Sequence, residues 1–119
     1  MRCFFCILIS AMLLLVAVGC GKNIAGPTAK DLKAFDSAPS EVKQMWDKAS
    51  EADKTNDYAT AETLLYAILR SEPSPDQREA ATRKLTAVTQ RLDSALEKGD
   101  PAAQAALEEL RRNPPNRPH

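Results

Sequence analysis

From residue 40 onward, apolar side chains recur at intervals of three and four residues between marked start and stop signals. This spacing is typical of one face of an α-helix, whereas a half-buried strand needs alternating apolar residues. The predicted helices span about 41–54, 58–70, 75–98 and 101–112. Alternation with a period of two never lasts long enough to predict a strand. The sequence therefore predicts an all-α domain over residues 40–112, built from antiparallel helical hairpins.

Residues suited to capping stand at each predicted helix start, because their side-chain oxygens can accept hydrogen bonds from the first backbone N–H groups. The predicted caps are Ser40, Asp57, Ser74 and Asp100. After Ser74 come Pro75 at the first helical position and Gln77 three residues after the cap, which is the pattern of a capping box. Gly99 ends the third helix, and the prolines in residues 113–119 predict an extended tail.

The first twenty residues have a different composition from the predicted domain. A basic start, Met1-Arg2, precedes an uncharged, largely apolar run of 16 residues at 3–18. A helix that spans a bilayer needs about 20 apolar residues. The shorter run favours a removable signal segment. All three cysteines of the chain lie in this part: Cys3, Cys6 and Cys20.

The run closes with Ala17-Val18-Gly19-Cys20, which resembles the lipobox of bacterial lipoproteins. Gly19 matches the small residue before the cleavage site and Cys20 matches the lipid acceptor, while Ala17 departs from the preferred leucine. The resemblance implies a signal peptide over residues 1–19, cleavage between Gly19 and Cys20, and a lipid on Cys20. It also implies that the protein is anchored to a membrane of the bacterial cell envelope.

Two other interpretations of this segment stay open. Ala17 and Gly19 also fit the small-residue rule for an ordinary secretory cleavage, which would release a soluble product. An uncleaved segment would instead act as a marginal membrane anchor. For a lipoprotein, Gly21 resembles the class that enteric-type Gram-negative bacteria send to the outer membrane, since an aspartate there favours retention in the inner membrane. We therefore expect an outer-membrane lipoprotein that faces the periplasm.

The region between the predicted lipid and the predicted helices has the composition of a flexible spacer. Residues 20–39 contain glycines, prolines and interspersed charges. They are predicted to form a lipidated cysteine followed by a flexible tether. The alternative is a short helix around residues 28–35, with Leu32 and Phe35 on its apolar side.

The turn and helix after residue 55 resemble the second half of a tetratricopeptide repeat. The matching residues are Asp57, Tyr58, Ala61, Leu65, Leu69 and Pro73. Asn56 stands where that family has glycine, and Ile68 stands where it has alanine. A similar turn at Gly99-Asp100-Pro101 comes later than a regular array with a period of about 34 residues would place it. The resemblance implies one helical hairpin of a kind that serves protein–protein interaction.

The sequence gives no pattern typical of an enzyme. The only histidine is His119 at the end of the tail, no cysteine follows Cys20, and no nucleophile or phosphate-binding glycine motif is present. We therefore predict no catalytic residues, no metal site, no cofactor and no small-molecule substrate. The formal net charge of zero gives no reason to expect a nucleic acid partner.

These observations predict a non-catalytic adaptor or assembly factor that binds other envelope proteins. Trp46, Tyr58 and Tyr66 are the candidate partner-binding residues, although their helical spacing also suits a core. The third predicted helix has a long apolar seam and only a short fourth helix to cover its far end, so self-association or a partner helix is also expected, and a small monomer of modest stability is the alternative. A self-associating structural spacer is the alternative function, and a small periplasmic enzyme comes third.

Overall fold

The structure is a computed structural model that describes residues 28–118, and these residues form five α-helices. The helices are α1 (Ala29–Ala34), α2 (Ser40–Lys54), α3 (Tyr58–Arg70), α4 (Pro75–Glu97) and α5 (Pro101–Arg112). No strand occurs between residues 28 and 118, which confirms the all-α prediction for that part of the chain. The predicted signal peptide, cleavage site and lipidated Cys20 lie outside the described residues.

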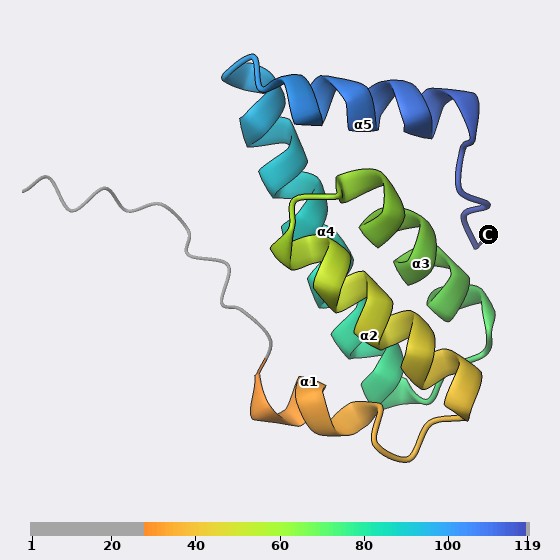
Figure 1. Cartoon of the computed structure of the whole chain (residues 1–119). Helices are drawn as coiled ribbons and strands as arrows, with labels where there is room; N and C mark the ends of the chain where they lie inside the picture. Colours follow the sequence, from red (N-terminus) through yellow and green to blue (C-terminus); the bar gives the residue numbers. More distant parts are fainter. Residues whose placement is uncertain (1–27, 119) are drawn as a thin grey trace, which may run out of the picture.

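Helices α2, α4 and α5 are arranged around α3, as Figure 1 shows. Helices α2 and α3 lie side by side and run in opposite directions, and α4 packs against α3 as its other antiparallel neighbour. Helix α5 crosses the end of α4 and also contacts α3, while the short α1 packs against α4 near the opposite end of the molecule. The predicted bounds of α2 to α5 agree with the observed bounds to within one residue.

Alanines stand at buried positions in the four longer helices. Ala49, Ala61, Ala81 and Ala103 are fully buried, one each in α2, α3, α4 and α5. A methyl group lets two helix axes approach closely, because the distance between packed helices depends on the side chains at the contact. Larger side chains fill the remaining space, and Leu65, Ile68 and Val88 are fully buried.

The predicted caps form at three of the four helix starts. Asp57, Ser74 and Asp100 each accept a hydrogen bond from a backbone N–H of the first turn, and Ser74 and Gln77 form the complete capping box. The prediction for Ser40 is wrong, because Ser40 is the first helical residue and Pro39 occupies the cap position without a side-chain hydrogen bond. The Ser40 hydroxyl instead accepts a hydrogen bond from Gln44 at 3.5 Å.

The tether predicted over residues 20–39 is wrong from residue 28 onward, where the short helix is observed. Thr28 and Asp31 form a capping box that starts α1. Phe35 follows the helix and is only 1% exposed, because its ring stacks on Trp46 of α2 with centroids 4.2 Å apart. Leu32, which was predicted to lie on the same apolar side of the helix as Phe35, is instead 58% exposed.

The apolar seam of α4 is partly covered within the chain. Val88 and Leu92 are buried, and both α3 and α5 pack against α4. Leu32 is the one large apolar side chain that is exposed among residues 28–118. Leu85, Ala95 and Leu96 of the same seam are only partly buried, and self-association stays a prediction. No helix within the described residues combines the length and hydropathy needed to span a bilayer.

The packing of Phe35 predicts that α1 belongs to the folded domain. Phe35→Ala should lower the free energy of unfolding by about 3 kcal/mol, because it removes a buried ring and leaves Trp46 uncovered. Urea unfolding followed by tryptophan fluorescence measures this loss. Leu32→Ala is the matched control and should leave the stability nearly unchanged, since Leu32 is exposed. Equal effects of the two substitutions would contradict the packing of α1.

Candidate protein-interaction site

Two of the three predicted partner-binding residues belong to the core instead. Trp46 is 4% exposed and Tyr58 is 5% exposed. Phe35 covers the ring of Trp46, and the Nζ atom of Lys84 lies 5.1 Å from its ring centroid. The prediction that Trp46 and Tyr58 contact a partner is therefore wrong, because the same helical spacing turns both rings toward neighbouring helices. Tyr66 remains partly exposed.

Tyr66 is the middle member of a row of three residues on one face of α3, which we call the α3 stripe. Glu62, Tyr66 and Arg70 are spaced four residues apart, so they lie above one another along the helix. Glu62 is 6% exposed, Tyr66 is half-buried and Arg70 is exposed. The stripe thus combines a buried carboxylate, an aromatic ring and a guanidinium group in one line.

The C-terminal tail, residues 113–118, contacts this stripe. Figure 1 shows the tail turning back from the end of α5 toward α3. The Nη1 atom of Arg70 donates a hydrogen bond to the backbone carbonyl of Asn116 at 3.0 Å, across 46 positions of sequence. The guanidinium carbon of Arg117 lies 5.7 Å from the ring centroid of Tyr66, within the range of a cation–π contact. The predicted extended tail is therefore non-helical, and it packs on the domain.

Glu62 provides negative charge at one end of the α3 stripe. Burial raises the pKa of its carboxyl group, and the nearby negative charge of Asp93 acts in the same direction. The hydroxyl group of Thr89, which donates a hydrogen bond to Glu62 at 3.1 Å, and the positive charge of Arg117 oppose that rise. The pKa of Glu62 is raised overall. The contacts with Thr89 and Arg117 therefore offset only part of the cost of burying the ionised carboxylate.

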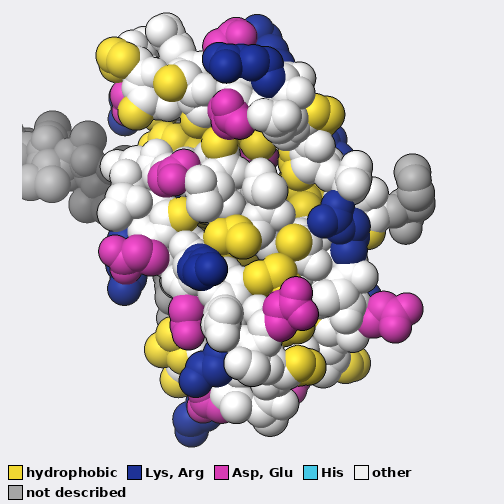
Figure 2. All heavy atoms as spheres, turned by 45° about the vertical axis from the view of Figure 1, so that its right-hand side comes forward, with side chains coloured by type: hydrophobic (Ala, Val, Ile, Leu, Met, Phe, Trp, Pro, Cys, Tyr) yellow, Lys and Arg dark blue, Asp and Glu magenta, His cyan; other side chains and the backbone are white. Residues whose placement is uncertain are grey.

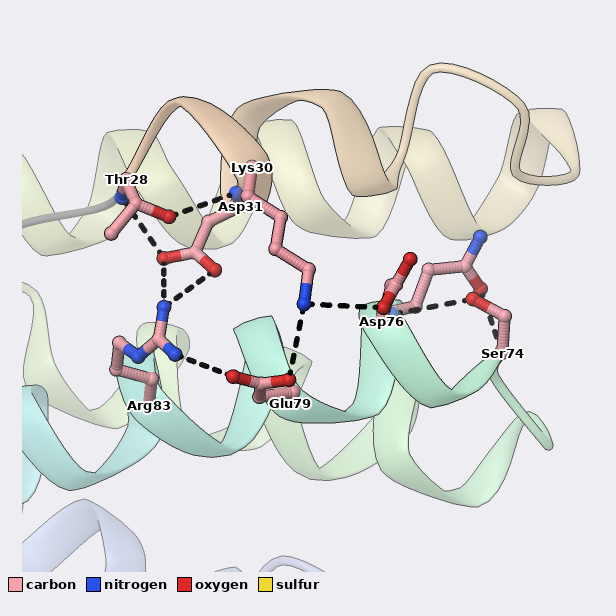
Figure 3. Close-up of polar contacts among 8 residues, drawn as sticks. Thr28, Lys30, Asp31, Ser74, Asp76, Glu79 and Arg83 are labelled. Carbon is pink, nitrogen blue, oxygen red and sulfur yellow. Dashed lines mark hydrogen bonds and ion pairs between the residues drawn. The ribbon is translucent and has the colours of Figure 1, made fainter.

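A second polar cluster fixes α1 on α4, and we call it the α1 junction (Figure 3). It comprises Thr28, Lys30, Asp31, Asp76, Glu79 and Arg83. The Nη1 atom of Arg83 donates to both carboxylate oxygens of the buried Asp31, at 2.8 and 2.7 Å. Arg83 also donates to Glu79 at 2.7 Å, while Lys30 lies 3.5 Å from both Asp76 and Glu79. The junction thus joins a buried ion pair to exposed ones.

The hydrogen bonds of Asp31 decide its ionisation. Burial alone raises the pKa of the Asp31 carboxyl group, but hydrogen bonds from the backbone of Thr28 and from Arg83 outweigh burial. The pKa of Asp31 therefore lies below its usual value. The side chain of Gln77 adds a contact to α1, because its Nε2 atom donates to the carbonyl of Ala34 at 3.1 Å. The capping box at the start of α4 thus also holds the end of α1.

Charged side chains also connect α4 to α2. The Nζ atom of the buried Lys84 lies 3.4 Å from Asp53, and Arg91 forms an ion pair with the same carboxylate. Burial lowers the pKa of Lys84, and the positive charge of Lys54 lowers it further, whereas the negative charge of Asp31 acts in the opposite direction. Because these residues already pair within the chain, they connect α2 to α4 through their side chains.

One face of the molecule carries both signs of charge. Figure 2 shows Lys and Arg side chains interspersed with Asp and Glu over one face, with apolar atoms in small patches between them. Among residues 28–118, no group of three or more His, Cys, Asp or Glu side chains is placed to hold a metal ion. At the α3 stripe, the C-terminal tail contacts α3 through one hydrogen bond and one cation–π contact.

The chain matches no protein-family model, no curated protein and no solved structure at a significant level.

The buried position of Asp31 predicts that its ion pair stabilises the fold. Asp31→Asn should lower the free energy of unfolding at pH 7 by about 1–2 kcal/mol, because Arg83 loses its charged acceptor. Chemical denaturation measures the difference. Lys30→Ala removes only exposed pairs of the same junction and should cause no measurable change. A larger loss from Lys30→Ala than from Asp31→Asn would contradict the role assigned to the buried pair.

The raised pKa of Glu62 predicts a pH-dependent effect of Glu62→Gln. The folded state binds a proton at Glu62 more readily than the unfolded state, so ionisation of this group lowers stability as pH rises through its folded-state pKa. A glutamine keeps an oxygen for the Thr89 hydrogen bond but carries no charge. The variant should therefore be more stable than the wild type at pH 7.

Thermal unfolding between pH 3 and pH 8 tests this prediction. The difference between Glu62→Gln and the wild type should vanish below the unfolded-state pKa of glutamate, where the wild-type carboxyl group is also neutral. A difference that stays constant over this range, or that favours the wild type at pH 7, would show that Glu62 is not penalised by burial.

Proposed function

We propose that the protein is a bacterial envelope lipoprotein that acts as a non-catalytic adaptor for other envelope proteins. The observation that carries the proposal is the position of Cys20. Cys20 directly follows a small residue at the end of an uncharged run, and no cysteine occurs after it in the chain. In this proposal a lipid on Cys20 holds the protein in the outer membrane, and the helical domain faces the periplasm.

The start of the folded domain sets how far it can lie from such an anchor. Thr28, where the capping box of α1 begins, lies eight positions after Cys20. A segment of that length spans at most about 29 Å even when fully extended. A tether that continued to residue 39 would reach considerably farther. The packing of α1 therefore favours an adaptor that works close to the bilayer surface.

The hairpin of α2 and α3 supports the resemblance to a tetratricopeptide repeat. Asn56 has a φ of +58°, which explains how it can replace the glycine of that family, since asparagine tolerates the left-handed region better than most residues. Tyr58 and Ala61 are both buried at the contact between helices, as the pattern requires. Repeats of this kind serve protein binding, which agrees with an adaptor.

The α3 stripe supports the binding part of the proposal. It holds the tail through one hydrogen bond to a backbone carbonyl and one cation–π contact. Both contacts can form with an extended segment of another protein. We therefore place the adaptor's binding surface at Glu62, Tyr66 and Arg70.

Lipidation at Cys20 can be tested in bacteria grown with labelled palmitate. We expect the wild type to incorporate the label and Cys20→Ala to lose it, with a matching mass shift at the mature N-terminus of the wild type. Cys6→Ala is the matched control and should still be labelled, because Cys6 lies in the segment that the cleavage removes. An unmodified soluble product from the wild type would contradict the proposed anchor.

A further inference from the structure

We propose that the α3 stripe is a binding site for an extended, proline-containing segment of a partner protein that carries a cationic side chain. The chain's own tail occupies this site when the partner is absent. This inference rests on the adaptor role proposed above and adds the chemistry of the partner. Residues 113–118, which pack on the stripe in the structure, show the kind of segment that the site accepts.

Each residue of the stripe recognises a different property of the tail. Arg70 binds the backbone carbonyl of Asn116, a group that every residue carries, so this contact sets position without selecting a sequence. Tyr66 offers its ring to the guanidinium group of Arg117, which selects a cation. Glu62 adds a negative charge that acts on the same guanidinium group. The stripe therefore selects a positive charge next to a free carbonyl.

The prolines of the tail favour the same mode of binding. Pro114 and Pro115 precede the contacting residues, and Pro118 follows them. Proline fixes φ and favours an extended backbone, so such a segment loses little conformational entropy when it binds. Its backbone carbonyls stay available to a donor such as Arg70, because no internal hydrogen bonds form. A partner segment of similar composition would present its groups in the same way.

The tail is bound in a way that allows its replacement. Asn116, Arg117 and Pro118 remain exposed, and Pro115 is only half-buried. The tail stays in place because its tether to α5 gives it a high effective concentration, on the order of millimolar. By contrast, Phe35 and Asp31 of the α1 segment are buried. The tail is therefore the exchangeable occupant and α1 is part of the fold.

The test uses the full-length chain in detergent micelles and a fluorescein-labelled peptide with the sequence of residues 113–119. Arg117→Ala weakens the chain's own tail but leaves the stripe intact, so it should bind the peptide roughly three- to tenfold more tightly than the wild type. Tyr66→Ala removes the ring and should weaken peptide binding about tenfold or more. Tyr66→Phe keeps a ring face for the cation and should bind like the wild type. Fluorescence anisotropy measures all four affinities.

A second peptide, with alanine in place of its arginine, tests the selection of charge and should bind roughly two- to fivefold more weakly, because it loses the cation–π contact. The opposite directions expected for Arg117→Ala and Tyr66→Ala are the decisive result, because a general loss of structure would weaken both. Circular dichroism of each variant confirms that the helices remain. Equal binding of the two peptides, or no gain in affinity from Arg117→Ala, would overturn the proposal.

The result of the peptide-binding test can be distinguished from the result of the lipidation test at Cys20. Peptide binding without lipid on Cys20 would leave the site in place and overturn only the anchor. Lipidation of Cys20 without peptide binding would overturn only the site.

Discussion

Helix α3 has to fit against three other helices at once, and this requirement organises the rest of the domain. Helices α2, α4 and α5 all contact it, so most of its surface must be apolar and closely fitted. Ala61, Leu65 and Ile68 are fully buried for this reason. Among the positions that remain, one row carries Glu62, Tyr66 and Arg70, while Thr60 and Thr63 are exposed outside it. That row is the α3 stripe, and its place beside the end of α5 explains why the C-terminal tail reaches it.

The α1 junction extends the domain toward its N-terminus. Apolar and charged contacts act together there, because Phe35 stacks on Trp46 of α2 while Asp31 pairs with Arg83 of α4. Lys84 continues the connection, since it lies over Trp46 and pairs with Asp53. A segment that composition alone would assign to a spacer is thereby fixed to both helices. Under the proposed anchoring at Cys20, this arrangement would keep the domain near the membrane.

Most of the local structure could be predicted from the sequence, although the cap at Ser40 and the start of α1 at Thr28 were not, and the long-range contacts could not be predicted. Caps such as Ser74 with Gln77 act within one turn, so they are visible as short patterns. The pair of Asp31 and Arg83 joins residues 52 positions apart, and no local pattern indicates it. The four-residue spacing of Glu62, Tyr66 and Arg70 places them on one face of a helix and could have indicated the stripe. The positions of Trp46 and Tyr58 fitted both a core and a partner-binding surface. Only packing distinguishes the two.

Binding of other envelope proteins by the anchored domain, through the α3 stripe, is the step on which the proposed function depends. Photo-crosslinking in native cells examines this step without isolating the partner, with a benzophenone amino acid at position 66 and a control at the exposed Lys48 of α2. We expect a crosslink from position 66, and not from position 48, to another envelope protein, at a segment that contains proline and an arginine or lysine. Crosslinks from position 66 to this chain alone, or the same products from both positions, would show that the stripe does not bind a partner.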